Sequence, residues 1–74
     1  MTKREFLSAM DDLLEVPDGT LSGPEKLEDF ANWNSLAMLG YIALADSHNG
    51  VELSPRQIRD CDSIDDLGRL AGIE

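Results

Sequence analysis

Ser35 and His48 are the first residues to consider for chemistry, because a serine beside a histidine can be a nucleophile beside its base. Ser35 follows Trp33 and Asn34 and opens a stretch that carries no charge until Asp46. If this stretch is one helix, a rise of 1.5 Å per residue places His48 about 20 Å from Ser35. A serine hydrolase is therefore excluded, and His48 is expected to be a polar residue near a helix end.

The remaining candidates give no metal or thiol chemistry. Cys61 is the only cysteine and His48 the only histidine, so neither an internal disulfide nor a zinc site can form. We expect Cys61 to face inward as an unreactive thiol. The segment 46–50 resembles a calcium loop only faintly, because its first and twelfth ligand positions would fall on Ala45 and Arg56.

Carboxylates gather in two short segments of the chain. Paired acids can perform acid–base chemistry, but only where burial or a pocket separates their pKa values. These acids are expected on polar helix faces and at helix starts, where they are solvated or complement the helix dipole. We interpret both groups as surface that a partner protein could recognise: Asp11, Asp12 and Glu15, and Asp60, Asp62, Asp65 and Asp66.

Ser35 is better understood as an attachment point than as a nucleophile. Asn34 is a good N-cap, and if it caps the helix, Ser35 becomes the first helical residue with its hydroxyl pointing outward. A group attached there through a phosphate would lie at the positive end of the helix dipole, beside unpaired backbone N–H groups. The sequence permits an anionic attachment at Ser35 without requiring one.

Composition limits the class of protein. Fifteen acidic and six basic residues give the 74-residue chain a net charge of -9, which disfavours nucleic acids and anionic membranes as partners. A hydrophobic content of 42% predicts that the chain folds, as one small domain over residues 1–74. No segment is apolar enough to span a membrane and none reads as a signal peptide, so we expect a monomeric cytoplasmic protein.

Four helices are expected, each from a local signal. Thr2 and Glu5 form a capping box before a helix over 3–15, which carries an apolar stripe. The second helix covers 35–49 and ends at Gly50. Ser54 and Pro55 start a short third helix over 55–60, and Ser63 with Asp66 caps a helix over 64–71, whose inward residues are Ile64, Leu67, Leu70 and Ala71.

Residues 16–34 form a long connection between the first two helices. A connection of this length usually packs as its own unit or is functional. A short helical turn is expected near residues 25–29, and the predicted anchors to the core are Leu21, Leu27, Phe30 and Trp33. The order of elements predicts an all-α fold, a small four-helix bundle with a long first loop and a short third helix.

The segment WNSLAML resembles the attachment motif of acyl carrier proteins, in which Asp-Ser-Leu begins the second helix. The likeness extends over nearly the whole chain: the long first loop, the link 50–53, the Ser54–Pro55 helix and the last helix. It implies that Ser35 carries 4'-phosphopantetheine and that Leu36 contacts partner enzymes. Such proteins have no activity of their own and hold an acyl or aminoacyl thioester on the arm, so Cys61 is not implicated.

The chain departs from the family at two places. Asn34 stands where the family has aspartate, which keeps the cap but removes a charge that the phosphopantetheinyl transferase can read. The second helix is largely neutral, and residues 11–29 hold the acids instead. Gly40 in mid-helix suggests a close approach or a flexible helix. We expect Leu39, Ile42 and Leu44 or Ala45 to face inward, and a partner to contact Leu36, Ala37, Met38, Tyr41 and Asp46.

These departures favour a specialised carrier, loaded by an adenylating ligase or an acyltransferase and read by a downstream synthase or transferase. Two alternatives remain open at this stage. One is an unmodified acidic adaptor that keeps the carrier fold and uses the second helix only for binding. The other is a carrier for primary fatty-acid synthesis. The sequence does not identify the cargo or the pathway.

Overall fold

The computed structural model describes residues 1–73 and contains four α-helices within them. These are α1 (Lys3–Leu14), α2 (Ser35–Asn49), α3 (Pro55–Arg59) and α4 (Ile64–Leu70), with a 3-10 turn, η1 (Leu27–Asp29), in the first connection. The expected all-α fold is confirmed, and between residues 1 and 73 the only β-type pairing is an isolated antiparallel bridge of Lys26 with Ser63. No helix in this range is long and apolar enough to cross a bilayer.

The helices begin where the capping signals predicted. The side chains of Thr2, Ser54 and Ser63 each accept a hydrogen bond from the backbone three residues on, and all three capping boxes are complete. The helix ends are one residue shorter than expected in three cases. Glu15 adopts a left-handed conformation with φ 59°, and Asp60 and Ala71 are the C-caps that follow α3 and α4.

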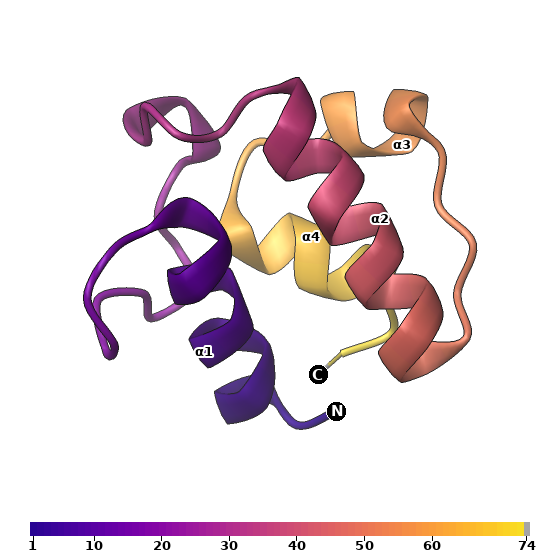
Figure 1. Ribbon diagram of the computed structural model, residues 1–74, viewed down its shortest axis with the longest axis horizontal. Coiled ribbons are helices and arrows are strands. Elements are labelled where there is room, and N and C mark those ends of the chain that lie inside the picture. The colour runs from indigo at the N-terminus through magenta and orange to yellow at the C-terminus, as the bar shows by residue number, and fades with distance from the viewer. Residues whose placement is uncertain (74) are drawn as a thin grey trace.

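In Figure 1, α2 lies across α4, with α1 on one side and α3 on the other. The first turn of α1 lies at one edge of the molecule, and α2 begins at the opposite edge (Figure 1). Phe6 and Tyr41 meet edge to face in the centre, with ring centroids 6.2 Å apart. The other large, fully buried apolar side chains are Met10, Leu14, Ile58, Ile64 and Leu67.

The long connection is fixed to the last helix by backbone hydrogen bonds. Leu27 donates to the carbonyl of Asp62 at 2.8 Å, and Ile64 donates to the carbonyl of Glu25 at 3.0 Å. Leu21 and Leu27 are buried, and Phe30 and Trp33 are half-buried against the core, which confirms all four anchors.

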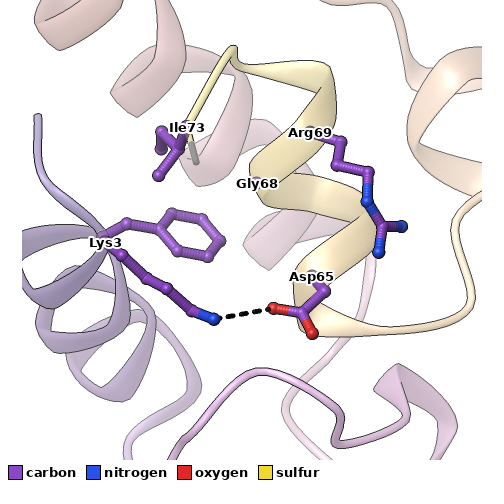
Figure 2. A pocket seen from close by; sticks show the side chains of 6 residues that line it. Lys3, Asp65, Gly68, Arg69 and Ile73 are labelled. Atoms are coloured by element: carbon purple, nitrogen blue, oxygen red, sulfur yellow. Dashed lines mark ion pairs between the residues drawn. The ribbon is translucent and has the colours of Figure 1, made fainter.

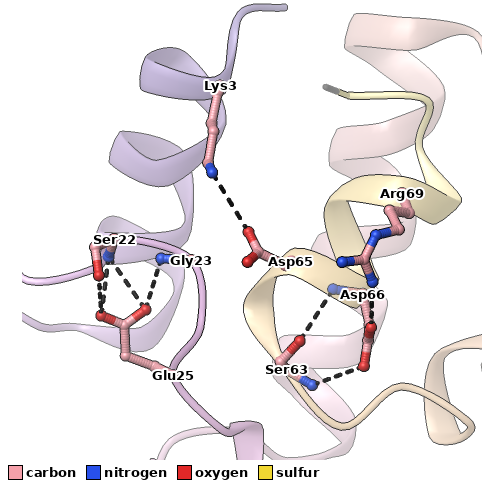
Figure 3. Close-up of polar contacts among 8 residues, drawn as sticks. All are labelled: Lys3, Ser22, Gly23, Glu25, Ser63, Asp65, Asp66 and Arg69. Carbon is pink, nitrogen blue, oxygen red and sulfur yellow. Dashed lines mark hydrogen bonds and ion pairs between the residues drawn. The ribbon is translucent and has the colours of Figure 1, made fainter.

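Side chains form further hydrogen bonds and an ion pair, within the connection and between α1 and α4 (Figure 3). The Glu25 carboxylate accepts hydrogen bonds from the backbone N–H groups of Ser22 and Gly23, while Lys3 pairs with Asp65 at 3.6 Å. Partial burial alone would raise the pKa of Glu25, but these hydrogen bonds prevail and lower it. The connection is therefore a packed unit rather than an open loop.

Asp11 was expected on a solvated helix face, and that interpretation is wrong. Its side chain is 1% exposed, and its two carboxylate oxygens accept hydrogen bonds from the backbone of Gly19 at 2.9 Å and of Leu21 at 3.1 Å. The connection folds back over α1 at this point and covers the carboxylate. Burial of Asp11 is tolerated because both oxygens are hydrogen-bonded.

Candidate functional site

At the start of α2, the N-cap and the first helical residue are those that the sequence predicted. The Asn34 side chain accepts a hydrogen bond from the backbone N–H of Ala37 at 3.1 Å, so Asn34 is the N-cap and Ser35 the first helical residue. Ser35 is exposed, because its side chain is not needed for the cap. Met38 makes the first backbone hydrogen bond of the helix, to the carbonyl of Asn34. The N–H groups of Ser35 and Leu36 thus lie ahead of the intrahelical ladder, at the positive end of a 15-residue helix.

His48 does not approach Ser35. Both residues belong to the continuous helix α2, Ser35 in its first turn and His48 in its last turn. At 1.5 Å per residue the separation is about 20 Å, so His48 cannot act as a base for the Ser35 hydroxyl. His48 is exposed beside the C-terminal end of α2, as expected.

The inward face of α2 differs from the one expected. Ala37, Tyr41 and Ala45 are buried, at 6%, 1% and 1% exposure. They stand four residues apart, which places them on one side of a helix. Ala37 and Tyr41 therefore cannot be the partner contacts that we expected them to be, whereas the inward position of Ala45 is confirmed.

The outward face carries leucines instead. Leu36 is 78% exposed and Leu39 is 59% exposed, so the expectation that Leu39 faces inward is wrong. Ala43 and Asp46 are also exposed and continue the same side at helical spacing. Together Leu36, Leu39, Ala43 and Asp46 form a continuous surface that begins beside Ser35, which we call the α2 stripe.

Two further residues of α2 lie between these faces. Met38 and Ile42 are half-buried against the core, so Met38 keeps some exposure for a partner while Ile42 is only partly inward. Leu44 is half-buried in the same way. Among the expected partner contacts, Leu36, Met38 and Asp46 thus remain accessible.

A groove joins the α2 stripe to the end of α1. It encloses about 330 Å³ and is lined by Asp12, Leu13 and Glu15 from α1 and its cap, and by Leu36 at the start of α2. Asn34 lies on the same wall, and the amide of Asn32 donates to the carbonyl of Leu14 at 3.0 Å, which holds the connection against α1. Asp12 and Glu15 are exposed, so their charges lie on the rim of a partly apolar groove next to Ser35.

Gly40 lies in close contact with Leu13 where α2 passes α1. A Cβ built on Gly40 would lie 2.7 Å from Cδ1 of Leu13, closer than side chains approach each other. The expected close approach at Gly40 is therefore present. It brings the carboxylates at the end of α1 alongside the first turns of α2.

Tyr41 connects α2 to α4. Its hydroxyl donates a hydrogen bond to the backbone carbonyl of Leu67. Burial, and to a smaller extent the neighbouring Cys61, raises the pKa of the Tyr41 phenol far above its usual range. Tyr41 is thus a neutral structural donor and not an acid that exchanges protons near neutral pH.

Cys61 is half-buried between α3 and α4, and its surroundings suppress thiolate formation. Burial raises the pKa of the thiol, and so do the carboxylates of Asp66, Asp60 and Asp62. A thiol in this environment is a poor nucleophile, which agrees with the expectation of an unreactive side chain.

The acids at the start of α4 are structural. Backbone hydrogen bonds from Asp62 and Ser63 lower the pKa of Asp66, which also pairs with Arg69 at 2.7 Å (Figure 3). No cluster of three or more potential metal ligands occurs within residues 1–73. The Asp66 carboxylate therefore stabilises the start of α4.

A second hollow lies between the first turn of α1 and α4 (Figure 2). It encloses about 220 Å³ and is lined by the Phe6 ring and Ile73, with Lys3, Asp65 and Arg69 at its rim. Its two cations are already paired, Lys3 with Asp65 and Arg69 with Asp66. None of its lining residues comes from α2, so this hollow is separate from Ser35.

Comparison with known proteins adds no assignment to this geometry. No protein-family model matches the chain, and neither a curated protein nor a solved structure matches it. The functional argument therefore depends on the residues at the start of α2 and on their surroundings.

Proposed function

We propose that the protein is an acyl carrier protein in which Ser35 bears a 4'-phosphopantetheine arm. The observation that carries the proposal is the division of roles at the start of α2. Asn34 caps the helix, which leaves Ser35 in the first turn with an exposed hydroxyl, and Leu36 is exposed beside it. The resemblance of the WNSLAML segment to the carrier motif supports the same assignment.

The position of Ser35 suits a phosphodiester. The ester would form at the serine oxygen, with its negative charge beside the backbone N–H groups of the first turn of α2. The helix dipole would stabilise that charge by about 0.3–1 kcal/mol at an exposed site. His48 lies at the far end of α2 and cannot activate the Ser35 hydroxyl, so the proposal assigns that activation and the installation of the arm to a separate transferase.

The arm's own thiol would carry the acyl or aminoacyl group as a thioester. Cys61 is unsuited to that role, because burial and three neighbouring carboxylates raise the pKa of its thiol. An adenylating ligase or an acyltransferase would load the arm, and a downstream synthase or transferase would receive the cargo. The α2 stripe carries only one acid, Asp46, which favours a specialised pathway over primary fatty-acid synthesis, whose carriers resemble this chain but carry several acids on the second helix.

Mass spectrometry tests the proposal directly. The protein is coexpressed with a broad-specificity phosphopantetheinyl transferase, and its intact mass is measured. We expect an increase equal to one phosphopantetheine group, which disappears in Ser35→Ala. A wild-type mass that stays unchanged after coexpression and after long incubation with transferase and coenzyme A would contradict the proposal.

Asn34 gives a matched comparison for the same assay. Asn34→Asp retains an oxygen that can accept from the N–H of Ala37, so the cap is preserved while a charge is added beside Ser35. We expect Asn34→Asp to be modified faster than the wild type by a general transferase. Equal rates would show that the transferase does not read this charge.

An unmodified adaptor is the second candidate, and the exposed leucines of α2 favour it independently of Ser35. An adaptor would use the α2 stripe for binding and would not need the serine hydroxyl. Deleting the gene in its source organism and complementing with Ser35→Ala separates the two. Full complementation by folded Ser35→Ala would support the adaptor, and failure to complement would support the carrier.

A further inference from the structure

We propose that the α2 stripe and the carboxylates of Asp12 and Glu15 together form the docking surface for a partner protein that presents an apolar face bordered by basic side chains. The charge that the partner reads is thus supplied by α1, while α2 supplies the apolar contact. The inference goes beyond the proposed function, because it does not require Ser35 to be modified.

The apolar half of this surface consists of Leu36, Leu39 and Ala43. Two leucines that are 78% and 59% exposed lie within one turn of each other on the outward side of a rigid helix. Burying an exposed leucine side chain in a complementary pocket is favourable by about 1.5–3 kcal/mol. α2 carries no charged residue before Asp46, so a partner surface can cover its first three turns without desolvating a charge.

The charged half lies on the adjacent edge. Asp12 and Glu15 line the same groove as Leu36, and neither carboxylate forms an ion pair with any residue in the range 1–73. Leu13 lies between them and forms part of the groove wall. A lysine or arginine of the partner can pack its aliphatic stem against Leu13 and Leu36 and direct its charged head to the two carboxylates.

A second copy of this chain does not fit the same surface. Each copy carries a net charge of -9, so a two-fold contact through the α2 stripe would bring two strongly acidic molecules together. Like charges across an interface are unfavourable. Charge complementarity therefore selects a basic partner and disfavours self-association.

The test uses Ser35→Ala protein, so that its outcome is independent of the arm. A synthetic helical peptide with leucines along one face and lysines and arginines along one edge is titrated into labelled protein, and amide chemical shifts are followed by NMR. We expect the changes to cluster at Leu36, Leu39 and Ala43 and at Asp12 and Glu15. A peptide with glutamates in place of its basic residues should bind much more weakly.

Variants separate the two halves of the surface. Leu39→Ser should weaken peptide binding about tenfold, as expected for the loss of one buried leucine. Asp12→Asn with Glu15→Gln should weaken it about threefold to tenfold at low salt and should remove most of its salt dependence. The matched control is Asp18→Asn with Glu28→Gln, which makes the same change in net charge at two exposed acids outside the groove.

Three results would overturn the inference. One is an equal loss of affinity in the control pair, which would show that net charge alone attracts the peptide. Another is a set of shift changes that avoids α2, or no change at millimolar peptide. The last is concentration-dependent dimerisation of the protein that Leu39→Ser abolishes, which would identify a second copy as the occupant. None of these outcomes depends on whether wild-type Ser35 is phosphopantetheinylated.

Discussion

The two long helices, α1 and α2, differ in which of their side chains are buried against the core. In α1 the buried residues Phe6, Met10 and Leu14 follow the apolar stripe of the sequence, and the opposite side is polar. In α2 apolar residues surround the helix, and the side that is buried contains two alanines and a tyrosine while two leucines are exposed. Side-chain pattern determines the orientation of α1, whereas the neighbours of α2 determine its orientation.

Those neighbours can be named. Gly40 faces α1, and a side chain there would displace Leu13 from its present position. Tyr41 has to face α4, because its hydroxyl donates to the carbonyl of Leu67. Once these two contacts are made, Leu36 and Leu39 are left on the outside.

The largest expected effect is at Tyr41. Tyr41→Ala should lower the free energy of unfolding by about 3–5 kcal/mol, because it removes the central aromatic side chain and leaves a cavity. Leu39→Ala on the outward side should cost less than about 1 kcal/mol. Urea unfolding of the two variants measures the difference directly.

A variant of this size can unfold a small domain completely, so Tyr41→Phe is the companion measurement. It keeps the ring against Phe6 and removes only the hydrogen bond to Leu67, at a cost of about 1 kcal/mol. If Leu39→Ala proved as costly as Tyr41→Ala, the assignment of the two faces of α2 would be wrong.

The second effect concerns the one charge that α1 buries. Asp11→Ala should lower the free energy of unfolding by about 1–3 kcal/mol, because it leaves the N–H groups of Gly19 and Leu21 without an acceptor. Asp12→Ala, one residue on and exposed, should change it by less than about 0.5 kcal/mol. Similar losses in the two variants would contradict the buried role of Asp11.

The third prediction concerns the contact between the two helices. Gly40→Ala improves helix propensity by about 1 kcal/mol but forces Leu13 to move, so its net effect should be near zero. In a Leu13→Ala background the clash is absent, and Gly40→Ala should then stabilise by about 1 kcal/mol. Additive effects in this double-mutant cycle would show that Leu13 does not restrict Gly40.

The smallest effect is expected in acid. Hydrogen bonds from the backbone and the hydroxyl of Thr2 lower the pKa of Glu5, and those from Asp62 and Ser63 lower the pKa of Asp66. A lowered pKa contributes stability that is complete above the ordinary values of 4.5 and 3.8, respectively, and is lost as the pH falls through the folded values.

Paired variants isolate this effect. Glu5→Gln and Asp66→Asn should each flatten the decrease in stability below pH 4.5, whereas Glu28→Gln, at an exposed residue of η1, should not. Thermal unfolding between about pH 3 and pH 7 provides the measurement. An unchanged pH dependence in Glu5→Gln would show that the first capping box contributes nothing to it.

The helices could be predicted from the sequence because their signals are local. Thr2 with Glu5, Ser54 with Pro55, and Ser63 with Asp66 specify helix starts through contacts within four residues. The predicted ends of α1, α3 and α4 are each one residue too late. At the end of α1, the residue in the left-handed conformation is Glu15 and not a glycine, so the sequence gives no signal for this position. The all-α class and the anchors of the long connection follow from the same short-range information.

The site could be predicted only in part. The capping role of Asn34 and the position of Ser35 as first helical residue are predicted correctly because capping is local, but the buried and exposed faces of α2 depend on α1 and α4. Asp11 was misread because its partners lie eight and ten residues away in the connection. One signal for it exists in the sequence: Asp11 stands four residues after Leu7 and three before Leu14, on the border of the apolar stripe.

The placement of the two ends of the chain has a consequence for how the protein can be joined to others. Lys3 and Ile73 line the same hollow, between the first turn of α1 and α4 (Figure 2). In Figure 1 the first turn of α1 lies at the edge of the molecule opposite the start of α2. A tag or a second domain joined at either end would therefore attach away from Ser35 and the α2 stripe.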